Sequence, residues 1–265
     1  MEHTPSRTAR EDLRQQLEAP IYNSIIEKWV GKGELDYERY LRTPELLSLQ
    51  TPTDERVVFD ELLFQVIHQA QELWLKLAAH ESIELVGDLD ADRLWEGSAR
   101  LERIARTLTC VRNELAILET LTPATYQVIR RTLGNGSGQE SPGYNAMRIA
   151  GKGVEEALER LLARRGLRLE EVYSSGEHPD LERICEQLVD VDEAFQGWLY
   201  GHFQLVRRTI GVDRSVKALD GIPTQVLSAR MSLPLFRALW DVKVALTASW
   251  KREDGPSRPL PEVGR

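Results

Sequence analysis

The hydrophobic positions after Glu61 recur at helical spacing and predict a helix that runs to about Glu84, with Asp54 as its candidate N-cap. The apolar residues are three, four or seven positions apart and do not alternate; they are Leu62, Leu63, Val66, Ile67, Leu73, Trp74 and Leu77. Such a helix is buried on more than one side, so His68 faces an interior, with Phe64 one turn before it. A single interior histidine is more often a hydrogen-bonded core residue than a ligand or catalyst, and both interpretations stay open.

Periodicity predicts further helices along the chain. They are expected over 93–120, from Thr122-Pro123, over 154–166, from Pro179 through Leu188, in a longer helix that continues to Ile210 with Gly211 at its end, and over 233–250. The sequence has no alternating run typical of a strand and no internal repeat. We therefore expect an all-α helical bundle as a single domain over residues 31–250. A partly disordered segment over 1–30 and a disordered tail over 251–265 flank this domain.

Two of these helices carry candidate functional residues. The helix ending near Ile210 carries one apolar stripe that includes Trp198 and a second interior histidine, His202. The helix opening at Pro123 places Tyr126 and Arg130 one turn apart, a pair suited to hold a carboxylate. A surface pair on an amphipathic helix is the alternative. The glycine-rich run 134–143 lacks the spacing of a nucleotide-binding loop and is expected to be a flexible loop.

The composition excludes several function classes. A formal net charge of -8 and 42% hydrophobic residues are typical of an acidic soluble protein and argue against a nucleic-acid surface. No apolar run approaches the roughly 18 residues of a membrane span, and the start has no apolar signal-peptide centre, so a cytoplasmic protein is expected. Cys110 and Cys185 lack the spacing of a zinc or redox motif, and both are expected to pack as small apolar residues.

Spacing also narrows the metal chemistry. The residue three positions before each of His68, His80, His178 and His202 is not glutamate, which excludes a carboxylate-bridged di-iron bundle. His80-Glu81 does not continue to the second histidine of a zinc-protease motif. No feature marks a serine or cysteine nucleophile, although spacing cannot exclude one. For a buried histidine among aromatic residues, axial ligation of haem remains.

Several separate stretches, in the same order, resemble the haem-dependent tryptophan 2,3-dioxygenases over roughly Tyr37 to Val242. The matching stretches are Tyr37-Glu-Arg-Tyr40-Leu41 with Leu46-Leu-Ser-Leu-Gln50; Asp60-Glu-Leu-Leu-Phe64 through His68-Gln69 and Glu72-Leu-Trp74-Leu-Lys76; Leu118-Glu-Thr-Leu-Thr-Pro123 through Tyr126 and Arg130; and Trp198 with His202. Matches in one order are far more specific than any one motif.

The resemblance implies a role for each marker residue. It implies His202 as the proximal ligand of haem b iron, with Trp198 and Ser137 near the haem, and His68 as the distal residue that accepts the indole N–H hydrogen bond. Phe64 would line the indole pocket, and Tyr126 and Arg130 would hold the substrate carboxylate. The segment containing Tyr37, Tyr40 and Leu41 would complete the pocket of a neighbouring subunit in a homotetramer.

The sequence departs from the family pattern mainly around the substrate. The family's glycine- and serine-rich loop, whose threonine helps to bind the substrate ammonium, is replaced by Ser215 to Thr224, whose two terminal residues are the candidates for that role. Leu115 stands where some members have a haem-contacting tryptophan, and Ile129 where a pocket phenylalanine is common. Gln139 stands where an aromatic residue follows the glycine, and the region after Arg148 is shortened.

The main hypothesis is therefore a haem-dependent dioxygenase that uses dioxygen to open the indole ring of L-tryptophan or a close analogue, giving an N-formylkynurenine-type product of tryptophan catabolism. A first alternative is a haem-dependent monooxygenase of tryptophan, a substituted tryptophan or another aromatic amino acid in secondary metabolism. A second is a non-catalytic haem-binding helical protein, although a scaffold would not need His68, Tyr126 and Arg130 together.

Overall fold

The computed structural model describes residues 8–18, 28–29, 35–136, 138–226, 229 and 233–249. The chain divides into two compact units, Met1–Pro52 and Thr53–Arg265. Within the described residues every regular element is helical, apart from one isolated bridge between Lys217 and Pro223. The predicted all-α fold class is thus confirmed.

The described residues of the first unit include short helices. They are α1 (Ala9–Glu18), α3 (Asp36–Leu41) and α4 (Thr43–Leu47). Pro44 lies in the first turn of α4, where its missing N–H costs no helical hydrogen bond. Helix α1 lies inside the segment for which partial disorder was expected, and the expected tail 251–265 lies outside the described residues.

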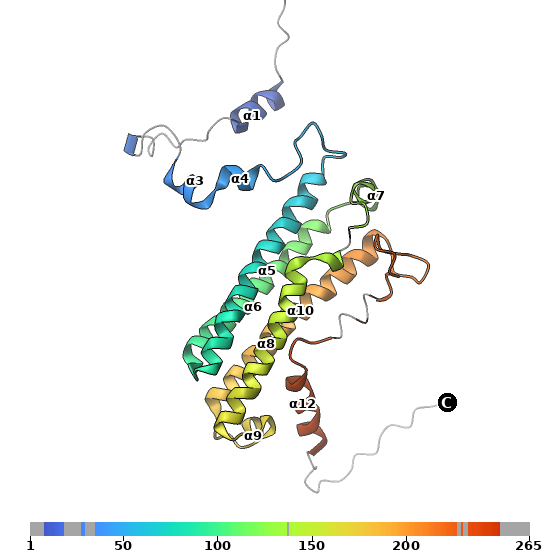
Figure 1. Ribbon diagram of the computed structural model, residues 1–265. Coiled ribbons are helices and arrows are strands. Elements are labelled where there is room, and N and C mark those ends of the chain that lie inside the picture. Colours follow the sequence, from blue (N-terminus) through green and yellow to red (C-terminus); the bar gives the residue numbers. More distant parts are fainter. Residues whose placement is uncertain are drawn as a thin grey trace, which may run out of the picture. The chain divides into compact units, whose positions relative to one another are not determined.

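The second unit is built on four long helices that run side by side (Figure 1). They are α5 (Glu61–Asp90), α6 (Leu94–Leu118), α8 (Pro142–Arg165) and α10 (Pro179–Thr209). Helix α6 packs against both α5 and α10, and α5 also packs against α8. The shorter elements are α7 (Pro123–Thr132), the single turn η1 (Gly138–Glu140), α9 (Leu169–Ser174) and α12 (Arg237–Ser249). In Figure 1, α7 lies at one end of the bundle and α9 at the other.

The core follows the predicted periodicity most closely in α6. Its near-heptad residues Leu101, Ile104, Leu108, Val111, Leu115 and Leu118 are all buried. Helix α5 is less enclosed than expected, because Val66, Leu73 and Trp74 are substantially exposed. Cys185 is buried as predicted, whereas the prediction for Cys110 was wrong, since it is exposed.

Three predicted helix boundaries were wrong. Helix α5 does not end near Glu84 but continues through Gly87 to Asp90, and its N-cap is Asp60, not Asp54. Helix α8 begins at Pro142, twelve residues before the predicted start, because Ser141 caps it by accepting a hydrogen bond from the Tyr144 amide. Helix α10 runs unbroken to Thr209, and Gly211 follows with a φ of 84° as the predicted C-terminal glycine.

A buried carboxylate attaches α12 to α10. Asp192 is fully buried, and its carboxylate accepts hydrogen bonds from the amides of Leu235 and Phe236 at 3.0 and 3.1 Å and from the Trp240 indole at 2.9 Å. These donors, together with Gln196, satisfy a charge that would be costly to bury alone. The helix carrying His202 is therefore tied to the segment that leads into α12.

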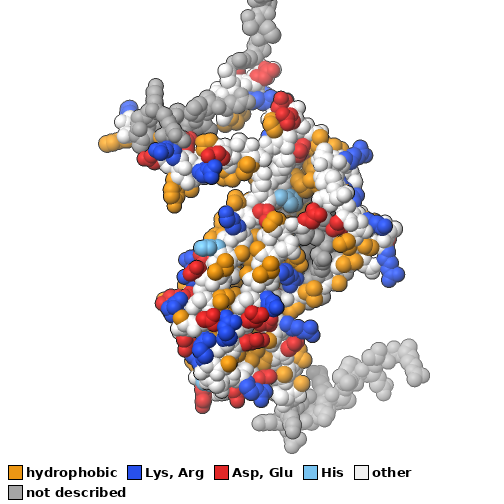
Figure 2. All heavy atoms as spheres, viewed as in Figure 1, with side chains coloured by type: hydrophobic (Ala, Val, Ile, Leu, Met, Phe, Trp, Pro, Cys, Tyr) orange, Lys and Arg blue, Asp and Glu red, His pale blue; other side chains and the backbone are white. Residues whose placement is uncertain are grey.

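The visible surface carries mixed charge. On the face shown in Figure 2, acidic and basic side chains are interspersed over the helical body and form no broad area of one sign. Among the described residues, no helix is both long and apolar enough to cross a membrane.

Candidate active site

His68 and His202 line the same cavity, which has a volume of about 400 Å³. His68 comes from α5 and His202 from the last turns of α10, so the two histidines reach the space from different helices. The other walls are mainly apolar and aromatic, and they include Phe64, Leu75, Tyr144, Trp198, Leu199 and Val206. The sequence prediction that both histidines face an interior is confirmed.

The tautomer of His68 follows from one hydrogen bond. Its Nδ1 lies 2.7 Å from the carbonyl oxygen of Phe64, which can only accept, so Nδ1 carries the proton. Burial lowers the pKa of His68, while the Phe64 carbonyl and the charge of Glu72 act in the opposite direction. The neutral ring therefore keeps an unprotonated Nε2, which can accept a hydrogen bond. The Phe64 ring packs on the imidazole with centroids 4.1 Å apart.

His202 has the chemistry of a metal-ligating imidazole. Burial, and secondarily the neighbouring His68, lowers the pKa of His202 to about 4, so its nitrogen lone pair stays available at neutral pH. Gly138 lies opposite Nε2: a Cβ on that glycine would stand 3.5 Å from the nitrogen. Because residue 138 is glycine, the space that a Cβ would occupy beside Nε2 stays open.

Trp198 lines this cavity and carries a buried indole donor. It is one turn before His202 on α10 and only 7% exposed. Its indole Nε1 is buried and has no hydrogen-bond partner among the residues that the structure describes. A buried donor of this kind is costly unless a ligand satisfies it. The neutral histidine, the space at Gly138 and this donor fit an axially ligated haem.

Tyr126 and Arg130, which the sequence placed on one face of their helix, both line the same cavity. Thr122 caps α7 by accepting a hydrogen bond from the Thr125 amide, and this start sets the register of both residues. The Tyr126 ring lies 6.2 Å from the Phe64 ring, and burial raises the pKa of its hydroxyl, which therefore stays protonated as a donor. Arg130 Nη2 donates to the Lys217 carbonyl at 2.7 Å.

The loop after α10 places Ser215 and Thr224 in different surroundings. Thr224 is fully buried and lines the cavity, and its hydroxyl lies 3.2 Å from the Asp213 amide, which donates to it. Ser215 is exposed, and its hydroxyl donates to the Asp213 carboxylate at 2.6 Å. Of the two sequence candidates, only Thr224 lines this cavity.

The remaining predicted residues lie elsewhere. Ser137 is outside the described residues. Tyr37, Tyr40 and Leu41 belong to the first unit, where their exposed fractions are 68%, 89% and 45%. Leu115 and Ile129, which depart from the family pattern, are buried core residues.

Sequence reasoning assigned no role to two cavity residues, Glu72 and Tyr144. Glu72 is one helical turn after His68, so the i, i+4 spacing was the signal that could have found it. Tyr144 follows the glycine-rich run, which was expected to be a loop. Its place in the site depends on the early start of α8 at Pro142.

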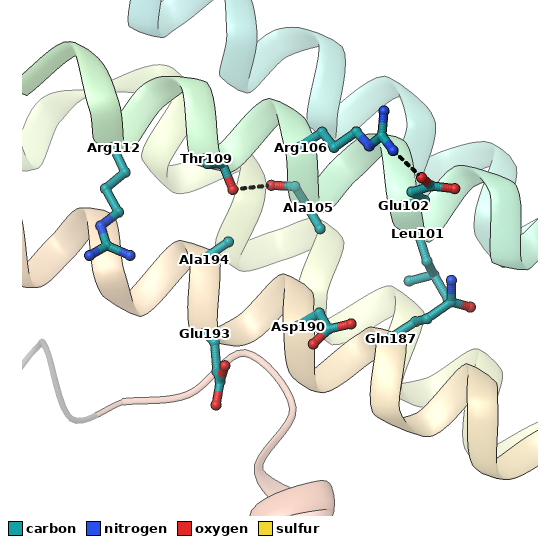
Figure 3. Close-up of a pocket in the computed structure, with 10 residues that line it drawn as sticks. All are labelled: Leu101, Glu102, Ala105, Arg106, Thr109, Arg112, Gln187, Asp190, Glu193 and Ala194. Atoms are coloured by element: carbon teal, nitrogen blue, oxygen red, sulfur yellow. Dashed lines mark hydrogen bonds and ion pairs between the residues drawn. The ribbon is translucent and has the colours of Figure 1, made fainter.

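A second hollow lies between α6 and α10 (Figure 3). Its walls are largely polar, and Figure 3 shows the ion pair between Arg106 and Glu102 and the hydrogen bond from Thr109 to the Ala105 carbonyl. None of its lining residues is a histidine or an aromatic residue. The histidine-lined cavity is therefore the better candidate active site.

Comparison with known proteins identifies the family of the chain. A family model described as tryptophan 2,3-dioxygenase matches residues 26–156. The chain is 32% identical to the tryptophan 2,3-dioxygenase of Xanthomonas campestris pv. campestris (strain B100), over 81% of this chain and 89% of that protein. The chain belongs to the tryptophan 2,3-dioxygenase family. A further relative, the tryptophan 2,3-dioxygenase of Erythrobacter litoralis (strain HTCC2594), is 31% identical over 80% of this chain and 99% of that protein.

Membership of the tryptophan 2,3-dioxygenase family confirms the predicted family, the fold class and the assignment as an oxygenase. The family also implies haem and dioxygen. The residue roles rest on the geometry of the cavity, where the marker residues Phe64, His68, Tyr126, Arg130 and His202 come together.

Proposed function

We propose that this protein is a haem-dependent dioxygenase that inserts both atoms of dioxygen into the indole ring of L-tryptophan or a close analogue, giving an N-formylkynurenine-type product. The observation that carries the proposal is the shared cavity, in which two histidines from different helices face the same apolar space as the Tyr126–Arg130 pair. Such a cavity offers a site for a metal-bearing ring and a polar clamp for an amino acid.

His202 is the proposed axial ligand of haem b, with Trp198 beside it and Ser137 as a further haem contact implied by the resemblance. Support comes from the depressed pKa of His202, the space at Gly138 and the unpartnered Trp198 indole. Haem supplies the iron chemistry that activates dioxygen, and the protein supplies binding and orientation.

Substrate orientation is the main task of the other residues. The guanidinium of Arg130 has several N–H donors, so it can bind a carboxylate while one N–H stays on Lys217. The protonated Tyr126 hydroxyl adds another donor. The unprotonated Nε2 of His68 accepts the indole N–H, and the Phe64 ring packs beside it. Thr224 is the proposed contact for the substrate ammonium.

A homotetramer is the proposed assembly, with Tyr37, Tyr40 and Leu41 completing a neighbouring subunit's pocket. Support comes from the exposure of these three apolar side chains, which would be covered in such an assembly. In this proposal residues 31–250 form the oxygenase domain, and the enzyme works in the cytoplasm. Light scattering of the full chain tests the assembly, and a monomeric mass would contradict it.

Oxygen counting tests the reaction. The protein is reconstituted with haem, reduced, and given L-tryptophan with isotopically labelled dioxygen, and the product is analysed by mass spectrometry. Ring cleavage by a dioxygenase adds two labelled atoms and needs no external reductant. Addition of one labelled atom would favour the monooxygenase alternative, since the second atom must then leave as water at the expense of two electrons. Haem binding without any product from aromatic amino acids would favour the non-catalytic alternative.

A further inference from the structure

The carboxylate of Glu72 joins the helix that carries His68 to the start of α8. The Ser141 hydroxyl donates to its Oε1, and the Gly143 amide donates to its Oε2 at 2.8 Å. Ser141 also caps α8 by accepting a hydrogen bond from the Tyr144 amide at 3.0 Å. A carboxylate from α5 thus satisfies an otherwise unpaired first-turn amide of α8, where negative charge is favourable.

Gly143 allows this close approach. A Cβ at that position would lie 2.6 Å from the Cβ of Leu75 and 2.8 Å from Oε2 of Glu72. Both distances are shorter than a van der Waals contact. A Cβ is fixed by the helix backbone, so no side-chain rotation could relieve the clash. Helices α5 and α8 therefore touch here only because residue 143 is glycine.

The contact between α5 and α8 formed by Glu72, Ser141 and Gly143 is called the joint below. Residues on both sides of this joint line the active-site cavity. Glu72 and His68 are one turn apart on α5, and both line it. On the other side, Tyr144 stacks on Phe195 with ring centroids 6.0 Å apart. The Ser141 amide donates to the carbonyl of Gly138, the residue opposite Nε2 of His202. The joint thus connects the distal histidine to the wall that faces the proposed iron ligand.

We propose that Glu72 is a positioning residue, which through Ser141 and Gly143 sets the separation between the His68 helix and the Gly138 wall opposite His202. Each carboxylate oxygen accepts a hydrogen bond from the start of α8, and the proposed role of Glu72 runs through these neighbours. This inference rests on the proposed function, because the space that the joint sets is the one that haem and substrate would share.

A matched control separates positioning from ordinary helix capping. Glu155 also accepts a hydrogen bond from the second residue of a helix, here the Ala238 amide of α12 at 3.2 Å, but it does not line the cavity. Glu155→Ala therefore removes a comparable cap away from the site. Glu72→Gln is the conservative variant, since its amide oxygen still accepts from Gly143 and its N–H₂ can donate to Ser141.

The first measurement is amide hydrogen exchange over residues 138–147 in the full-length protein without added haem. Glu72→Ala and Gly143→Ala should speed exchange there by about tenfold or more, since each disrupts a charge-assisted hydrogen bond at this joint. Ser141→Ala, which keeps the Gly143 bond, should have a smaller effect. Glu72→Gln and Glu155→Ala should leave this segment close to wild type. Unchanged exchange in Glu72→Ala would overturn the claim that Glu72 stabilises the start of α8.

The second measurement is the C–O stretching band of the reduced, haem-loaded protein under carbon monoxide, which senses the space around the distal face. Glu72→Ala and Gly143→Ala should shift or broaden the band, whereas Glu72→Gln and Glu155→Ala should not. Faster exchange with an unchanged band would reduce Glu72 to a structural cap and overturn the positioning role alone. Failure of the wild type to bind haem would instead overturn the proposed function, and the positioning role with it.

Discussion

Arg130 reaches from α7 to the loop that follows α10, where its Nη2 donates to the Lys217 carbonyl at 2.7 Å. Their separation of 87 residues makes this a tertiary contact between two walls of the cavity. The same guanidinium is the proposed carboxylate clamp. It therefore holds the loop in place and presents its remaining N–H groups to the substrate.

Replacing Arg130 should weaken substrate binding more than it slows chemistry. Arg130→Lys keeps the charge but loses the planar fork, and we expect kcat/KM for L-tryptophan to fall by about ten- to a hundredfold, mainly through KM. Tyr126→Phe should lower kcat/KM for L-tryptophan several-fold less than Arg130→Lys does. Tryptamine, which lacks the carboxylate, should be turned over equally poorly by wild type and variant. If the wild type turned over tryptamine clearly faster than Arg130→Lys does, the role of Arg130 as a carboxylate clamp would be contradicted.

His202→Ala should abolish the haem absorption spectrum of the wild type while the helical fold is retained. The imidazole is the proposed axial ligand, and no replacement donor is created by alanine. His80→Ala is the matched control, because His80 is an exposed histidine of α5 outside the cavity. An unchanged haem spectrum in His202→Ala would show that the axial assignment is wrong.

Gly138→Ala should weaken haem uptake without unfolding the protein, because its Cβ would enter the space 3.5 Å from Nε2 of His202. Gly87→Ala is the control. Gly87 lies inside α5 with open space around it, so alanine should stabilise the protein by about 0.5–1 kcal/mol and leave haem uptake unchanged. Haem titration and urea unfolding of both variants provide the comparison. Equal haem affinity of the two variants would show that the open space at Gly138 is not needed for haem binding.

Thr224 and Ser215 should differ in their effect on the substrate ammonium. Thr224→Val removes a hydroxyl from the cavity, and we expect KM for L-tryptophan to rise by about five- to tenfold, the value of one neutral hydrogen bond. Ser215→Ala should leave KM unchanged because Ser215 is exposed and does not line the cavity. Indole-3-propionate, which lacks the amine, should bind both variants alike. A larger effect of Ser215→Ala would reverse the assignment.

Acidification should destabilise the protein through His68. Burial lowers the pKa of His68 below its ordinary value, so between that lowered pKa and about 6.5 the unfolded chain binds more protons than the folded one. The free energy of unfolding should therefore fall as the pH drops below about 6.5. In His68→Gln this decline should be shallower, as measured by urea unfolding between about pH 5 and 8. An equally steep decline in the variant would show that His68 does not contribute.

The sequence predicted those parts of the site that lie within one helix. The stripe on α10 and the Tyr126–Arg130 spacing on α7 depend on local periodicity and on Thr122-Pro123, which a sequence displays directly. The start of α8 was missed because the glycine-rich residues before it resemble a loop. Its cap is completed by Glu72, a partner 69 residues from Ser141, and no local pattern reveals such a contact.

The predicted length of α5 was wrong for a related reason. The predicted helix ended near Glu84, before Gly87, yet α5 continues past this glycine because Asp88 and Leu89 are buried. Asp88 accepts hydrogen bonds from Arg93 and Arg100, which hold the helix end to α6. Tertiary packing thus overrides the low helix propensity of one glycine.

The buried Asp192 has a consequence for the order of events during synthesis. Its backbone donors begin at Leu235, 43 residues further along the chain. Until the ribosome has delivered that segment, α10 carries a carboxylate without the donors that make its burial tolerable. The helix with the proposed iron ligand therefore completes its packing only after α12 has been made, so loading of the cofactor is expected to follow translation of that segment.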